Sequence, residues 1–291
     1  MMPKAKRKKT GRTGSLGWIL GAAAVGIGAG IAVERAIVGR SRFALDPYSH
    51  EPYGRIRGDR RFEVSTPDGA VLVGDEVGPR DATRGVIFLH GFCLDRTIWH
   101  HQYRGFTDNR KYVFYDARHH GEVTGGSLPT DTRVLAADLK AVLDHSGLQE
   151  VVLVGHSMGG MTVLEFCREH PEETGGRVKG LVLVNTTYTD AIKTLVAAEI
   201  ISPIERRARR VIDMLLDNRR SSRLARLRTD DLSWLLVKLM GFGPKASPSQ
   251  IEFVHSLLTC FPSPQLVETL RGIRAFDMEE ALAKIDVPTL I

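Results

Sequence analysis

The 291-residue sequence has few cysteines and few aromatic side chains, and the scarcity of cysteine removes whole classes of protein. Cys93, Cys167 and Cys260 form no CxxC motif and no Cys/His cluster, so neither a zinc site nor a redox pair is indicated. We expect the three cysteines to be buried free thiols. If the domain lies outside the cytoplasm, one disulfide bond between two of them is the alternative. No motif for another metal or for a cofactor is present, and the sequence predicts none.

Positive charge exceeds negative charge by 40 residues to 34, but the excess is confined to the N-terminus. The first twelve residues carry six positive charges and no acid: Lys4, Lys6, Arg7, Lys8, Lys9 and Arg12. The remaining 34 basic residues match the 34 acidic ones, so the folded part is about neutral. This distribution argues against a nucleic-acid partner.

An uncharged run from Leu16 to Val33 follows the basic cluster, in the order typical of a signal anchor or a secretory signal peptide. As a helix it would cover roughly 27 Å, which is marginal for a bilayer, and its five glycines weaken insertion. We expect residues 1–38 to associate with a membrane as a single anchor, with the folded domain extracytoplasmic. Cleavage after a small residue such as Ala32 would instead give a secreted protein.

The remainder alternates between strand-length and helix-length segments, after a linker at residues 39–60. The turn signal Pro67-Asp68-Gly69 predicts an antiparallel hairpin between residues 61–65 and 70–75. A helix capped by Thr130 or Asp131 should run to His145 and stop at Gly147. Short apolar strands are predicted at residues 85–89, 111–115, 150–154 and 180–184, as in the βαβ units of a parallel sheet.

The alternation is interrupted at residues 188–271, which have no convincing strand and read as a helical cap. We therefore expect a first part of the core at residues 61–187 and a return to the core at residues 272–291. That return should contain a helix starting at Asp277-Met-Glu-Glu280 and a strand from Val287. Nine arginines between Arg206 and Arg228 alternate with apolar residues, which indicates a solvated charged helix face or a lid resting on anionic lipid.

The most informative segment is Val151-Val-Leu-Val-Gly155-His-Ser157-Met-Gly159-Gly160. It is a G-x-S-x-G sequence placed directly after a buried strand and before an amphipathic helix. Gly155 and Gly159 are required because the turn is so sharp that larger side chains would collide with the neighbouring strand and helix. The pattern predicts that Ser157 sits on a tight turn with its hydroxyl at the carboxyl edge of the sheet.

This segment resembles the nucleophile elbow of the α/β-hydrolase superfamily, and especially that of serine esterases and lipases, including monoacylglycerol-lipase-like enzymes. The resemblance covers about Phe62 to Ile291. It implies an α/β-hydrolase fold, in which a mostly parallel sheet has helices on both faces and carries a helical cap; here the fold would be C-terminally incomplete. Serine at the elbow argues against dehalogenases and epoxide hydrolases, which use aspartate.

Two further segments support the resemblance. Phe88-Leu-His90-Gly91-Phe92 stands where the family has its oxyanion loop, which implies that the backbone N–H groups of Phe92 and Met158 hold the oxyanion, with His90 organising the loop. Tyr115-Asp-Ala-Arg118-His-His-Gly121 is similar to the family's D-x-R-G-x-G segment, with His119 where glycine is usual. Its polar side chains, Asp116, Arg118 and His120, should brace the loops.

The family's chain order is serine, acid, histidine. The acid usually follows the strand that starts here at Val287, and the histidine comes later, so both are expected beyond Ile291 in a longer protein. Within this chain Asp190 and His255 are weak acid and base candidates.

The sequence thus predicts a serine hydrolase of carboxylic esters, with a small-molecule acyl ester, lipid esters included, as substrate. The alternative from another class is a non-catalytic hydrolase-like ligand-binding protein or an inactive fragment. Within enzymes, acyltransferase, thioesterase, C–C hydrolase and haloperoxidase-like activities stay open, because fold and elbow are shared while the cap sets the substrate.

Overall fold

The computed structural model describes residues 38–40, 42–55, 57–106, 108–190, 230–260 and 263–291. The expected membrane segment and the arginine-rich part of the cap lie outside these ranges. The chain divides into two compact units, one within Met1–Ser49 and Arg228–Ile251, the other within His50–Leu227 and Glu252–Ile291. None of the helices formed by the described residues is long and apolar enough to cross a membrane.

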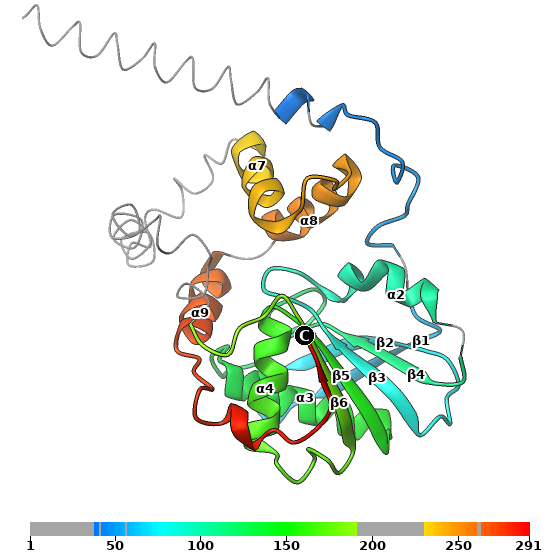
Figure 1. Cartoon of the computed structure of the whole chain (residues 1–291), viewed down its shortest axis with the longest axis vertical. Helices are drawn as coiled ribbons and strands as arrows, with labels where there is room; N and C mark the ends of the chain where they lie inside the picture. Colours follow the sequence, from blue (N-terminus) through cyan, green and yellow to red (C-terminus); the bar gives the residue numbers. More distant parts are fainter. Residues whose placement is uncertain (1–37, 41, 56, 107, 191–229, 261–262) are drawn as a thin grey trace, which may run out of the picture. The chain divides into compact units, whose positions relative to one another are not determined.

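A seven-stranded sheet forms the centre of the second unit, in the order β1-β2-β4-β3-β5-β6-β7 (Figure 1). The β1–β2 and β2–β4 pairs are antiparallel, and all other neighbours are parallel. This confirms the predicted hairpin and the mostly parallel α/β architecture. The strands are β1 Arg60–Ser65, β2 Val71–Val77, β3 Arg84–Leu89, β4 Lys111–Tyr115, β5 Glu150–His156, β6 Val178–Val184 and β7 Thr289–Leu290.

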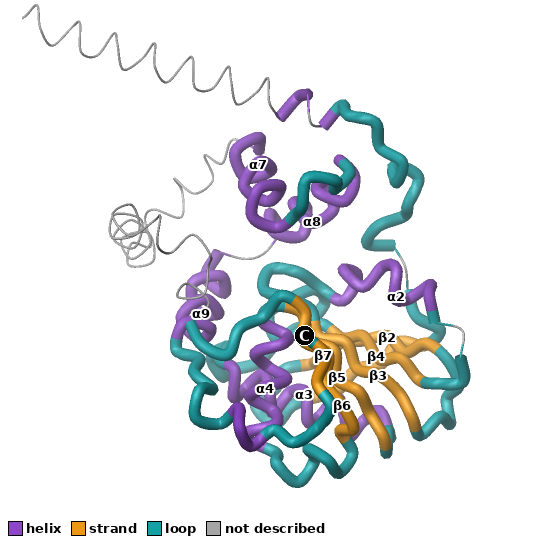
Figure 2. Tube along the Cα trace, viewed as in Figure 1, coloured by secondary structure: helices purple, strands orange, loops and turns teal. Residues whose placement is uncertain are grey.

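Helices connect the parallel strands (Figure 2). The second unit holds η1 Arg96–Trp99, α2 His100–Gly105, α3 Thr132–Ser146, α4 Met158–Glu169, α9 Ser263–Arg274 and η3 Leu282–Lys284. The predicted boundaries of α3 are confirmed, since Asp131 accepts the Val134 N–H at 2.9 Å and Gly147 ends the helix at φ +69°. The cap region contributes α7 Asp230–Gly241 and α8 Pro248–Cys260.

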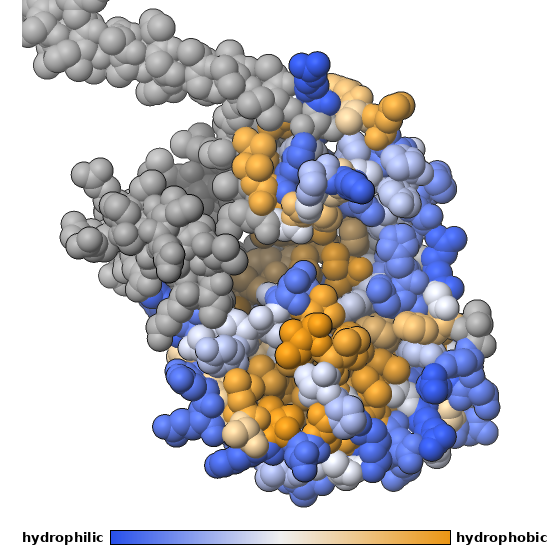
Figure 3. Space-filling model, viewed as in Figure 1, coloured by the Kyte–Doolittle hydropathy of each residue, from blue (hydrophilic) through white to orange (hydrophobic). Residues whose placement is uncertain are grey.

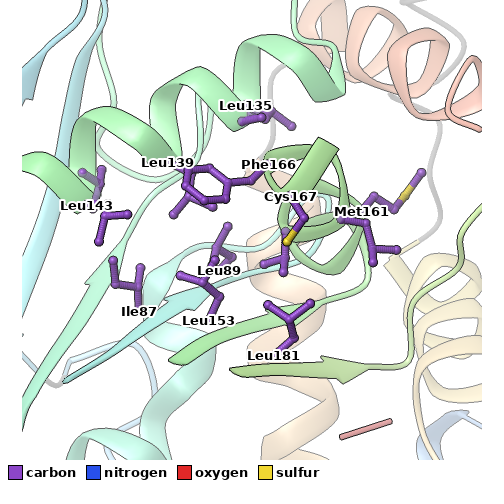
Figure 4. Close-up of a cluster of buried hydrophobic side chains, with 14 of the residues drawn as sticks. Ile87, Leu89, Leu135, Leu139, Leu143, Leu153, Met161, Phe166, Cys167 and Leu181 are labelled. Atoms are coloured by element: carbon purple, nitrogen blue, oxygen red, sulfur yellow. The ribbon is translucent and has the colours of Figure 1, made fainter. Parts of the chain in front are cut away.

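Strand pleating separates two apolar layers, one on each face of the sheet. Ile87, Leu89 and Leu153 point toward α3 and α4, where they pack against Leu139 and Phe166 (Figure 4). Alternate residues of the same strands point the other way, and Phe88 and Phe114 pack there with Trp99 and Tyr103 of η1 and α2. Because the central strands β3, β4 and β5 are covered on both faces, they read as nearly continuous apolar runs in the sequence.

The first unit is held together by two side-chain contacts. The Arg42 guanidinium lies 5.3 Å from the centre of the Trp234 ring, which ties the segment before Ser49 to α7. The Asp46 carboxylate accepts the Ser249 N–H at 2.7 Å, in the first turn of α8. Residues 39–49 of the expected linker therefore contact α7 and α8.

The helix expected to start at Asp277 is absent from the described return to the core. Asp277 instead accepts the Glu279 N–H at 3.0 Å in a local turn, and the Met278 N–H donates to the Tyr188 carbonyl at 2.8 Å. These bonds hold the segment against the loop after β6, and only the short η3 forms. The strand predicted from Val287 is present as β7, and it pairs in parallel with β6. Leu290 in this strand is 65% exposed, and hydrophobic residues gather on this face (Figure 3).

Candidate active site

Ser157 lies on the bend between β5 and α4, in a backbone conformation that a non-glycine residue rarely adopts. Its φ is +52° and its ψ is −117°. The flanking glycines make this bend possible: a Cβ at Gly155 would lie 2.5 Å from the Gly159 carbonyl oxygen, and one at Gly159 would lie 2.3 Å from the Leu89 carbonyl oxygen. The predicted elbow, with its two obligatory glycines, is therefore present, and the Ser157 backbone is strained.

The elbow is fixed to the neighbouring strand ends. The Ser157 N–H donates to the Val184 carbonyl at 3.0 Å, at the end of β6. The Ser157 carbonyl oxygen accepts the Gly160 N–H at 2.9 Å and the Thr186 hydroxyl at 2.7 Å. Thr186 was not singled out from the sequence, because it lies 29 positions from Ser157 and no local pattern links the two residues.

The loop after β3 meets the elbow at Gly91. A Cβ added there would lie 2.8 Å from His156 Nδ1 and 3.2 Å from the Ser157 Cβ, so glycine lets the loop pass close to the elbow without displacing these side chains. Phe92 follows directly, and Met158 is the first residue of α4. The structure thus brings Ser157 and the two peptides expected to hold an oxyanion to one edge of the sheet.

Two buried histidines join this loop to the segment after β4. His90 Nε2 accepts the Ala117 N–H at 2.9 Å, and His120 Nε2 accepts the Cys93 N–H at 3.1 Å. Each Nδ1 lies against a carbonyl oxygen, that of Gly91 at 2.8 Å for His90 and that of Arg118 at 2.7 Å for His120. His90 and His120 therefore organise loops, as the sequence predicts.

Two clusters of buried ion pairs also hold the loops around the site in place. Arg96 is buried and bonds to the Asp75 carboxylate at 2.7 Å and to that of Asp116, which also accepts the Arg96 N–H at 2.7 Å. Burial raises the pKa of Asp116 above its ordinary value, while Arg96 acts in the opposite direction. A second cluster joins Arg118 to Asp68 and Asp138. Asp116 and Arg118 thus brace loops as expected. The contribution of Asp75 and Arg96 was not predicted from the sequence.

His119, which stands where the family motif has glycine, has φ +62°. Replacing it by glycine removes the left-handed strain but adds freedom to the unfolded chain, so we expect a net stabilisation of about 0.5–1 kcal/mol. Urea denaturation of His119→Gly beside the wild type measures this change. An equal or larger gain from His119→Ala would show that backbone strain is not the cause.

His120 makes the stability of the fold depend on pH. Burial, and then the neighbouring His90, lower the pKa of His120 to about 3 from its ordinary value of 6.5. Below pH 6.5 the unfolded chain therefore binds a proton that the folded chain does not, and the free energy of unfolding falls by up to about 1.4 kcal/mol per pH unit as pH drops toward 3.

The variant His120→Gln keeps a polar side chain but removes this titration. We expect its free energy of unfolding, measured by urea titration between pH 7 and pH 4, to fall less steeply than that of the wild type. Parallel curves for the two proteins would contradict the assignment.

Asp190 and His255 are buried, Asp190 after β6 and His255 on α8. Among the described residues, neither side chain is hydrogen-bonded to the Ser157 hydroxyl. A cavity of about 660 Å³ lies at the other end of α4, beside Cys167 and Arg168, and is not lined by Ser157. Within the described ranges, no group of three or more His, Cys, Asp or Glu side chains could hold a metal ion.

Comparison with known proteins places this geometry in a family. Residues 85–225 match the family model described as alpha/beta hydrolase fold. Over 133 residues the chain is 32% identical to a non-heme chloroperoxidase of Streptomyces lividans, a match covering 45% of this chain and 46% of the relative. A bifunctional esterase/perhydrolase of Acinetobacter calcoaceticus is 33% identical over 132 residues, with coverage of 45% and 46%.

Solved structures agree on the fold. An esterase from Exiguobacterium antarcticum superposes with a TM-score of 0.61 at 20% identity, over 80% of this chain and 79% of that one. Sheet order, elbow and family match together define an α/β-hydrolase fold with serine at the elbow. The chain therefore has the α/β-hydrolase fold, and its sequence is similar to that of an esterase/perhydrolase. It spans about half the length of the curated relatives it matches.

Proposed function

We propose that this protein is a serine hydrolase that cleaves carboxylic esters. The observation that carries the proposal is the strained conformation of Ser157 at φ +52°, with Gly91 packed against it. Such strain persists only where the surrounding structure enforces it, and it clusters at functional sites. Esterase activity in the printed name of the Acinetobacter relative points in the same direction.

In the proposed reaction, Ser157 Oγ forms a bond to the acyl carbon while its proton passes to a base. The N–H groups of Phe92 and Met158 stabilise the oxyanion, at about 3 kcal/mol per donor. The C–O bond to the leaving alcohol then breaks as the base returns the proton to that oxygen. Water attacks the acyl-enzyme and releases the acid.

A fluorophosphonate probe tests the nucleophile. After labelling of the full-length protein and proteolysis, mass spectrometry should find the adduct on the peptide containing Ser157, and esters such as p-nitrophenyl acetate should be hydrolysed. Binding of fatty acids without labelling or turnover would favour the ligand-binding alternative and refute the proposal.

A second candidate activity is perhydrolysis, favoured by the names of the two relatives above. Hydrogen peroxide would replace water in the attack on the acyl-enzyme, so that a peracid leaves in place of the acid. Peroxide is the nucleophile in this step: its O–O bond is kept in the peracid, the bond from the acyl carbon to Ser157 Oγ breaks, and the released peracid is the species that oxidises bromide. Peracid formation from acetate ester and peroxide, measured by bromide oxidation, supports this activity; acetate as the sole product excludes it.

We further propose that residues 1–38 associate the protein with a membrane, with the hydrolase domain outside the cytoplasm or, after cleavage, secreted. The order of basic cluster and apolar run supports this proposal. Expressed in cells, the protein should stay in the membrane fraction after alkaline carbonate washing. Replacing Ala23 and Val25 by aspartate should release it, whereas release of the unsubstituted protein would contradict anchoring.

A further inference from the structure

Both peptides expected to bind the oxyanion have a carbonyl oxygen that is hydrogen-bonded to a side chain as well as to backbone N–H groups, that of Leu94 for Gly91 and those of Gly160 and Met161 for Ser157. The first is the Gly91–Phe92 peptide, whose carbonyl oxygen lies 2.8 Å from His90 Nδ1. The second is the Ser157–Met158 peptide, whose carbonyl oxygen lies 2.7 Å from the Thr186 hydroxyl. In a trans peptide the C=O and the N–H point in opposite directions, and the described residues have no cis bond. Anchoring each carbonyl therefore sets the direction of its N–H.

The hydrogen bonds of His90 determine where its proton lies. Because the Ala117 N–H can only donate, His90 Nε2 must accept, and it carries no proton. In the neutral ring the proton is then on Nδ1, which donates to the Gly91 carbonyl. The bond to Ala117 thus selects the tautomer that holds the first peptide in place.

We propose that His90 and Thr186 are paired positioning residues for the oxyanion hole, a role that rests on the proposed function. Each donates to the carbonyl of one of the two peptides and so aims the opposite N–H at the space beside Ser157. The donated bond also polarises the peptide, which strengthens its N–H as a donor. Neither residue touches the substrate; both act through the peptides that do.

Thr186 offers a sharp pair of variants. Thr186→Val keeps the packing against Gly160 but removes the hydroxyl, whereas Thr186→Ser keeps the hydroxyl. We expect Thr186→Val to lower kcat for ester hydrolysis, and the rate of fluorophosphonate labelling, about tenfold with KM little changed, because the oxyanion forms only in the transition state. Thr186→Ser should recover most of the loss. The matched control is Thr187→Val, whose hydroxyl oxygen accepts the Thr189 N–H.

His90 offers a second pair, in which each variant keeps one of the two hydrogen bonds. Asparagine can place an N–H near the position of Nδ1 and donate to Gly91, whereas glutamine can place an oxygen near Nε2 and accept from Ala117. We expect His90→Gln to be the slower enzyme although both variants lose one hydrogen bond. A purely structural role for His90 predicts equal losses.

The outcomes separate this inference from the proposed function. If the wild-type protein shows no labelling of Ser157, the hydrolase proposal itself fails. If the wild type reacts but Thr186→Val and His90→Gln react equally fast, only the positioning role fails. The His90 tautomer is measured independently by ¹⁵N NMR of labelled histidine, where a proton on Nε2 would overturn the inference whatever the kinetics show.

Discussion

Ser157→Ala is expected to abolish fluorophosphonate labelling and to lower ester turnover by about 10⁴-fold or more, since the nucleophile itself is removed. The Ser157 hydroxyl makes no hydrogen bond to other described side chains, and alanine meets the same backbone strain. The free energy of unfolding should therefore change by less than about 0.5 kcal/mol. Initial rates and urea denaturation on the same preparation measure both quantities.

Ser157→Gly separates the chemistry from the strain at this position. It also removes the nucleophile, but glycine tolerates φ +52° and ψ −117° at little cost. We expect Ser157→Gly to be inactive. Its free energy of unfolding should exceed that of Ser157→Ala by about 1 kcal/mol, a net difference that already includes the extra conformational entropy of glycine in the unfolded chain. Persistent labelling in either variant would show that another residue is the nucleophile.

The parts of the fold that could be predicted are those that local chemistry determines. Asp131 and Gly147 end α3 because a cap and a left-handed stop depend on single residues. The elbow could also be predicted from the sequence, since only glycine fits at the positions two before and two after Ser157. The helix expected at Asp277 was wrong because the Met278 N–H bonds to the distant Tyr188, a contact that no local pattern reveals.

The supporting residues of the site were harder to predict for the same reason. Thr186 reaches Ser157 across neighbouring strands, and Arg96 meets Asp75 and Asp116 from separate segments of the chain. A threonine after a strand or an arginine in a loop has no periodic or spacing signal of its own. Their roles follow from the order of strands in the sheet, which places β6 beside β5 for Thr186 and brings β2, β4 and β3 together for Arg96.

Replacing the buried Arg96 should have a large effect on the stability of the fold. Arg96→Leu leaves the carboxylates of Asp75 and Asp116 without their cation, both in nearly full burial. An uncompensated buried charge costs several kcal/mol, and we expect the free energy of unfolding to fall by about 3–5 kcal/mol. Because Asp116 also accepts the Arg96 N–H next to the oxyanion loop, ester turnover should fall in the molecules that stay folded.

Arg84→Leu is the matched control, since Arg84 pairs with Glu150 at the surface, where the two side chains are 70% and 43% exposed. Its loss should cost no more than about 1 kcal/mol. Adding Asp116→Asn to Arg96→Leu removes one of the stranded charges, so the double variant should be more stable than the sum of the single changes predicts. Strict additivity would show that Arg96 contributes through packing of its side chain rather than through charge.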